Sequence, residues 1–174
     1  MPATIPDVRR PSLCVVLALP ALLAFADDPP SVDHQPIPCS IPAKPISVCA
    51  SITDDAMVAK AKLYFRASDD KFYSWVEMAF GGFQYCGTLP APRDGKLKSI
   101  DYYVQAIDDQ YQSQRTSTFQ MLVQPEGVCE FPPLEKDAAR AAAIKVFGTN
   151  ARQGKKMNDA FDPAGVTFVP VPGS

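Results

Sequence analysis

Residues 60–66 read KAKLYFR, and their polar and apolar side chains alternate with a period of two. This period is typical of a half-buried β-strand, because successive side chains of a strand point to opposite faces of the sheet. Ala61, Leu63 and Phe65 fall on one face of such a strand. We therefore expect these three residues in a core and the residues between them on an outer surface.

Similar segments recur along the middle of the chain. They are rich in Val, Tyr, Phe and Thr and are separated by Asp, Ser and Gly turns, a texture typical of an all-β domain. No ten-residue helical pattern lies between them, which excludes a parallel α/β sheet, and the pair Gly81-Gly82 suits a hairpin loop. The expected strands are Ile46–Ile52, Val58–Arg66, Phe72–Phe80, Phe83–Leu89, Ile100–Ile107 and Arg115–Val123.

The middle of the chain also resembles a known kind of module. The stretches AKLYFR, YSWVEM, FQYCGTLPAP, IDYYVQAIDD and RTSTFQMLV look like the second half of a fibronectin type III or immunoglobulin-like module of bacterial secreted proteins. The resemblance covers residues 46–123 and implies an antiparallel immunoglobulin-like β-sandwich. It implies little about function, because such modules serve as adhesive, spacer and carbohydrate-enzyme accessory units. The sequence departs from the usual seven-stranded pattern of these modules, because only one clear strand precedes Asp54.

The first 26 residues are typical of a secretory signal peptide. A basic pair precedes an apolar run over residues 13–25, and Ala24-Phe25-Ala26 forms a small-x-small cleavage site. The run contains Pro20 and is shorter than the roughly 20 residues of a membrane-spanning helix. We therefore expect cleavage after Ala26 and a secreted or periplasmic protein.

Removal of the signal peptide would remove Cys14 and leave four cysteines, an even number in an oxidising compartment. Their spacing lacks the Cys-x-x-Cys pairs of structural zinc sites, so we expect two disulfides. Three connectivities are possible, and the sequence gives only a weak preference. A Cys49–Cys86 bridge would join two strands, and a Cys39–Cys129 bridge would tie the ends of the domain together.

The two ends of the chain differ from its middle in composition. Residues 27–45 contain six of the 18 prolines, which favours an extended leader over helix or strand. The β-sandwich domain is expected over residues 46–124, and an irregular C-terminal tail over residues 125–174. In the tail, Asp137 and Gly148 bound a short expected helix, and the final apolar run from Val166 is at most an edge strand.

The composition argues against several functions. Seventeen basic and 19 acidic residues give a net charge of −2, and the basic residues form no patch that would grip nucleic acid. The single histidine, His34, lies in the proline-rich leader and has no local acid or nucleophile placed to act as a catalytic partner, so we expect a solvated loop residue. The chain lacks a nucleophile elbow, a metalloprotease helix and a phosphate-binding glycine loop. We expect no enzyme, although Glu77 with a loop Asp could act on a sugar.

Strand alternation also brings aromatic residues to one outer surface. If the apolar sets of the central strands face the core, four aromatic residues face outward, with Lys62, Arg66 and Glu77 around them. The four are Tyr64, Tyr73, Trp75 and Tyr103. Such a face suits a protein partner or stacking on sugar rings. Two alternatives to a binding role are open. In one, the aromatic residues only stabilise the sheet as cross-strand pairs; in the other, the C-terminal tail covers them.

The sequence therefore predicts a non-enzymatic binding or scaffold module that presents this aromatic face to an envelope protein or a polysaccharide. An accessory domain or small enzyme that acts on cell-wall sugars is an alternative. A calcium-dependent adhesin is another, because the resemblance places four loop carboxylates at one end of the module, where they could hold calcium. These are Asp54, Asp55, Asp108 and Asp109. We favour the simpler interpretation that each aspartate caps its own turn.

Overall fold

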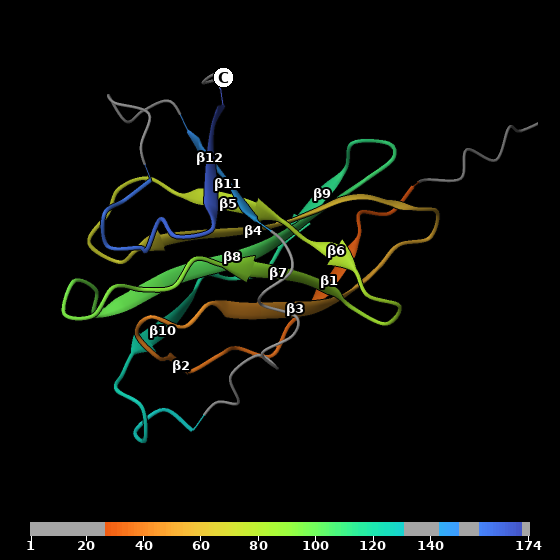
Figure 1. The fold of residues 1–174 in the computed structure, drawn as a ribbon. Helices are drawn as coiled ribbons and strands as arrows, with labels where there is room; N and C mark the ends of the chain where they lie inside the picture. Colours follow the sequence, from red (N-terminus) through yellow and green to blue (C-terminus); the bar gives the residue numbers. More distant parts are fainter. Residues whose placement is uncertain (1–26, 131–142, 150–156, 172–174) are drawn as a thin grey trace, which may run out of the picture.

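The computed structural model describes residues 27–130, 143–149 and 157–171. These residues form strands joined by turns and loops, and no helix occurs among them, so the expected all-β class is confirmed. The strands are β1 (Ser31–Asp33), β2 (Cys39–Ser40), β3 (Ile46–Thr53), β4 (Val58–Ala67), β5 (Ser74–Glu77), β6 (Ala79–Phe80), β7 (Tyr85–Leu89), β8 (Ser99–Asp108), β9 (Ser113–Arg115), β10 (Phe119–Val123), β11 (Ile144–Thr149) and β12 (Val166–Val171) (Figure 1). The expected signal peptide, residues 1–26, lies outside the described residues.

Two sheets make up the fold. The smaller has the strand order β1-β3-β7-β6, and the larger has the order β12-β11-β5-β4-β8-β10-β2, with β9 also paired to β8. We expected only antiparallel pairs, but β2 pairs with β10, and β11 with β12, in parallel. Both parallel pairs lie at edges of the larger sheet, where a segment arrives from a distant part of the chain.

The core lies between the two sheets. Leu63 of β4 and Tyr102 of β8 are completely buried, whereas the neighbours of each along its strand are half-exposed. Val48 and Ala50 of β3 supply the facing layer and are also completely buried. The expected core positions Ala61, Leu63 and Phe65 are therefore confirmed, and the alternating apolar residues of the neighbouring strands are buried with them: Val76, Met78, Tyr102, Val104 and Ala106.

The proline-rich leader contains two short strands, so the prediction of a leader without strands was wrong. Its strand β1 pairs antiparallel with β3, where Asp33 lies opposite Ser51. Its strand β2 pairs in parallel with β10, where Cys39 lies opposite Leu122. The prolines do not prevent this, because they flank the two strands and do not interrupt them. The leader therefore covers edges of both sheets.

The C-terminal tail extends the larger sheet. Strand β11 pairs with β5, and β12 forms the edge expected for the last apolar run. The helix expected from Asp137 to Gly148 is wrong for its second half, because residues 144–149 form a strand; residues 137–142 lie outside the described residues. Val146 is completely buried, so the open edge of β5 and the core it borders outweigh the local preference for helix.

The two disulfides are Cys39–Cys129 and Cys49–Cys86, the pairing that the sequence weakly preferred. Cys49 and Cys86 lie directly opposite each other in β3 and β7. Cys39 and Cys129 are 90 residues apart. A bridge across so long a loop stabilises a fold by about 4–5 kcal/mol in the chain-entropy treatment. It also holds the leader against the end of the domain.

Candidate binding face

An uninterrupted row of aromatic side chains crosses four strands on the outer face of the larger sheet. Phe147 of β11 lies opposite Trp75 of β5, Trp75 lies opposite Tyr64 of β4, and Tyr64 lies opposite Tyr103 of β8. Each residue is therefore a direct cross-strand neighbour of the next. We call Phe147, Trp75, Tyr64 and Tyr103 the aromatic row.

The rings of the aromatic row pack against one another. Phe147 and Trp75 are stacked, with their centroids 4.1 Å apart and their planes at 10°. Tyr64 and Tyr103 are stacked at 4.7 Å and 8°, and a tilted contact of 6.3 Å joins Tyr64 to Trp75. Tyr73 meets the edge of Tyr103 at 5.1 Å. The four residues expected on one face thus lie together, and their binding role stays a prediction.

Three cations lie over these rings. The ammonium of Lys62 is 4.3 Å from the centroid of the Trp75 ring, and the guanidinium of Arg66 is 4.8 Å from that of Tyr73. The guanidinium of Arg115 is 5.1 Å from the centroid of Tyr103. Each distance is within the range of a cation–π contact. The stacked neighbours and the cations therefore occupy faces of these rings.

Some of the charged side chains around the aromatic row are already held by partners within the protein. Arg66 donates to Asp101, with 2.9 Å between Nη2 and Oδ2, and Ser68 donates to the same carboxylate. Burial would raise the pKa of Asp101, but these hydrogen bonds outweigh it and hold the pKa below its usual range. Burial and the neighbouring Lys60 lower the pKa of Lys62. Arg66 is therefore committed to an ion pair, whereas Arg115 is exposed at the end of the row.

Phe147 and Arg115 belong to this face and were not among the residues predicted from the sequence. Phe147 was assigned to a helix, although Ile144 and Val146 alternate with Lys145 and Phe147 in the pattern of a strand. That alternation was the available signal. The described part of the tail extends the face through Phe147 of β11, and the alternative in which the tail covers the aromatic residues falls partly on residues outside the described ones.

His34 is not a solvated loop residue, and that prediction was wrong. Its ring is half-buried, with Nδ1 2.8 Å from the carbonyl oxygen of Cys49 and Nε2 3.0 Å from the hydroxyl of Tyr102. It also contacts Phe119 edge-on at 5.4 Å. His34 therefore holds the leader between β3, β8 and β10, and this role depends on partners that are distant in sequence.

The aspartates expected at one end of the module act in their own turns. Asp54 accepts a hydrogen bond from the backbone of Ala56, and the buried Asp108 accepts from Gln110 and Gln112. Asp55 and Asp109 are exposed in the same loops. Across residues 27–130, 143–149 and 157–171, no group of three or more carboxylate, histidine or cysteine side chains is arranged to hold a metal ion. Turn capping therefore engages one oxygen of Asp54 and one of Asp108, while Oδ1 of Asp54 and Oδ2 of Asp108 are buried without a hydrogen-bond partner among the described residues, and calcium binding stays a prediction.

Comparison with known protein families, curated proteins and solved structures finds no match for this chain. The resemblance to fibronectin type III and immunoglobulin-like modules therefore stays a prediction. In the part of the chain that the structure describes, no helix has the length and hydrophobicity needed to cross a membrane. The role of the aromatic row must be argued from its geometry.

Proposed function

We propose that this chain is a non-enzymatic binding module that offers the aromatic row to a protein partner outside the cytosol. The observation that carries the proposal is the row itself, with four aromatic residues in direct cross-strand contact on an outer sheet face and the exposed Arg115 at one end. Trp, Tyr and Arg are the residues that most often dominate the energy of protein–protein interfaces.

The orientation of the rings favours a protein over a polysaccharide. The face of an aromatic ring carries the negative part of its quadrupole and attracts the C–H groups of a sugar that lies flat on it. In the aromatic row, Phe147 stacks on Trp75 and Tyr103 stacks on Tyr64, while Lys62 lies over Trp75. Ring edges and polar tips suit the mixed contacts of a protein interface.

The strand order supports an immunoglobulin-like arrangement as part of this proposal. Immunoglobulin domains have strands ABED in one sheet and CFG in the other, and variable-type domains add further strands beside C. The order β1-β3-β7-β6 corresponds to ABED, and β5-β4-β8-β10 corresponds to an extended CFG sheet. In this assignment the aromatic row lies on the CFG side, which β11 and β12 widen. The two disulfides indicate an oxidising, extracellular environment.

Site-specific photo-crosslinking tests the proposal. A photoreactive side chain replaces Lys145, an exposed residue of β11 next to Phe147, and in a control protein it replaces Thr88 on the smaller sheet. We expect a discrete protein adduct from the cell envelope at position 145 and none at position 88. Arg115→Gln is expected to weaken binding of that partner at least tenfold, because guanidinium groups at an interface commonly contribute that much. Arg93→Gln, at another exposed arginine, is the matched control.

Two results would contradict this proposal. In the first, the protein sediments with deproteinised cell-wall polysaccharide, Arg115→Gln abolishes this binding and Arg93→Gln keeps it. The ligand would then be a sugar. Equal crosslinking at positions 145 and 88 would leave the aromatic row with only the stabilising role that cross-strand pairs have in ordinary sheets.

A further inference from the structure

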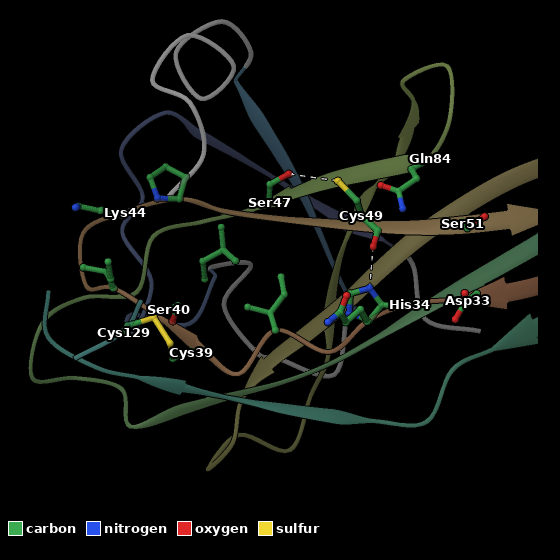
Figure 2. A pocket seen from close by; sticks show the side chains of 15 residues that line it. Asp33, His34, Cys39, Ser40, Lys44, Ser47, Cys49, Ser51, Gln84 and Cys129 are labelled. Atoms are coloured by element: carbon green, nitrogen blue, oxygen red, sulfur yellow. Dashed lines mark hydrogen bonds between the residues drawn. A yellow bond between two sulfur atoms is a disulfide. The ribbon is translucent and has the colours of Figure 1, made fainter. Parts of the chain in front are cut away.

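A pocket of about 590 Å³ lies between the first half of β3 and the leader (Figure 2). Leader residues 33–41 line one side of it, and Cys129, bonded to Cys39, lines the end near Lys44. Its apolar lining includes Ile37, Ile41 and Ile46. The volume lies within the range of roughly 300–1,000 Å³ that is typical of ligand sites. This pocket is separate from the aromatic row.

The wall formed by β3 is a sheet edge that no other described strand pairs with beyond Ser51. Strand β1 pairs with β3 only from Thr53 to Ser51, and the chain then turns away from β3 after Asp33. Cys49 lies opposite Cys86 with 4.1 Å between their α carbons. Such a distance is typical of antiparallel pairs that do not exchange backbone hydrogen bonds, which are about 4.5 Å apart against about 5.5 Å in bonded pairs. The N–H and C=O of Cys49 therefore point away from β7, toward the pocket.

The same alternation turns the N–H and C=O of Ser47 toward the pocket. His34 occupies one of these edge groups, the carbonyl of Cys49. No hydrogen bond within the described part of the chain engages the N–H of Cys49 or either backbone group of Ser47. Two donors and one acceptor are therefore presented in the spacing of a β-strand.

A buried hydroxyl lines the same pocket. Ser40 is only 5% exposed, and its Oγ has no hydrogen-bond partner among the described residues. Most buried polar side chains have a partner, and an unpaired one costs about 1–3 kcal/mol. The Oγ atom is closed off from solvent, so a ligand in the pocket would reach it only by displacing the contacts that bury it.

We propose that this pocket binds an extended peptide, which adds as a strand to the Ser47–Cys49 edge of β3. Strand addition uses backbone hydrogen bonds for affinity and side-chain pockets for selectivity. The open part of β3, residues 46–50, spans about 16 Å at the rise of a strand and accommodates about five residues. One peptide side chain would enter the space between the isoleucines and Ser40.

The charges at the two ends of the pocket give the peptide a direction. Asp33 lies at one end and Lys44 at the other, where Lys44 also pairs with the exposed Glu126 at 2.6 Å (Figure 2). A peptide with its amino end near Asp33 and its carboxyl end near Lys44 runs antiparallel to β3. It continues the line of β1, which the leader leaves after Asp33.

Amide exchange by NMR, with and without peptide, tests this proposal. The probes are uncapped pentapeptides in which threonine alternates with one varied residue: valine, leucine, phenylalanine, serine or asparagine. In the free protein we expect fast exchange at Ser47 and Cys49 and slow exchange at Val48 and Ala50, whose amides face β7. At saturating peptide, exchange at Ser47 and Cys49 should slow at least tenfold.

Substitutions on the edge of β3 then distinguish strand addition from nonspecific peptide binding. Ser47→Pro removes an N–H that β7 does not use, so binding should weaken at least tenfold while Val48 and Ala50 stay protected; Ser47→Thr, which keeps the N–H, should bind normally. Should Ser47→Pro not fold, Lys44→Glu takes its place and should weaken binding severalfold, because it reverses the charge that faces the carboxyl end of the peptide. Any of three results would overturn the proposal. The amides of Ser47 and Cys49 are already protected in the free protein, no peptide at millimolar concentration changes their exchange, or Ser47→Pro binds peptide as well as the wild type.

Discussion

His34 makes the stability of the fold depend on pH in a specific direction. The carbonyl of Cys49 can only accept, so Nδ1 of His34 must carry a proton and donate to it across 2.8 Å. In the neutral ring, Nε2 is then bare and accepts from the hydroxyl of Tyr102, whose oxygen accepts from the backbone N–H of Ile37 at 2.7 Å. In this series of three hydrogen bonds, every donor and acceptor is paired only while His34 is neutral.

Protonation of His34 disrupts this arrangement. The new proton on Nε2 would point at the Tyr102 hydroxyl, which would lose its acceptor inside a buried site. Burial lowers the pKa of His34 below its ordinary value of 6.5, and it outweighs the carbonyl of Cys49 and the charge of Asp33, which both raise the pKa. The unfolded chain therefore takes up the proton first as the pH falls. Stability is fully present above about pH 6.5 and decreases between that pH and the lower folded-state pKa.

The substitution His34→Asn isolates this effect. The amide of Asn can donate to Cys49 in place of Nδ1 and does not titrate, so at about pH 7.5 the variant should lose about 1–2 kcal/mol for the missing Tyr102 bond and ring contacts. As the pH falls, the wild type should lose up to about 1.4 kcal/mol per pH unit relative to the variant. Urea unfolding of both proteins across this range measures the difference. A difference that stays constant, or widens in acid, would refute the neutral-His34 network.

Three further substitutions test other parts of the structure. Trp75→Ala should lower the free energy of unfolding by about 2 kcal/mol, because it removes the stacked contact with Phe147 and the cation–π contact with Lys62, and Trp75→Phe should lose less; urea unfolding measures both. Gly148→Ala should cost roughly 1–3 kcal/mol by calorimetry, because the ring of Phe168 lies against the α carbon of Gly148 and an added methyl group would collide with it. Asp108→Ala should cost about 3 kcal/mol by urea unfolding, because it leaves the backbone N–H groups of Gln110 and Gln112 without their charged acceptor, and Asp108→Asn should cost less than half as much.

The central strands could be predicted because their information is local. In β4 and β8 each apolar residue sits two positions from the next, so the pattern alone determines which side chains enter the core. The outward placement of Tyr64, Trp75 and Tyr103 follows from the same pattern. The four cysteines outside the expected signal peptide likewise led to two disulfides, because their spacing lacks the Cys-x-x-Cys pairs of a structural zinc site.

The edge strands could not be predicted because they depend on the edges that receive them. Strand β2 has two residues and no periodicity of its own; it forms because β10 offers an unpaired side and Cys129 holds Cys39 there. The alanines before β11 favour a helix locally, yet residues 144–149 pair with β5 and bury Val146. His34 was misjudged for the same reason, since its partner Tyr102 is 68 positions away.

The other edge strands of the two sheets are short, covered or interrupted by proline, whereas part of β3 is not. An unpaired strand edge is a template for association with other chains, and proteins usually shorten, cover or interrupt it. Here β2 and β6 have two residues each, β12 carries Pro170 within its exposed edge, and β1 covers the end of β3. The segment from Ser47 to Cys49 belongs to an eight-residue strand, contains no proline, and faces the pocket. A leader that continued straight from Asp33 would have closed it; instead Ile37 donates to Tyr102, and the side chain of His34 takes only the carbonyl of Cys49 on this edge. The same contacts therefore anchor the leader and shape the edge, so loss of the His34–Tyr102 contact should affect peptide binding as well as stability.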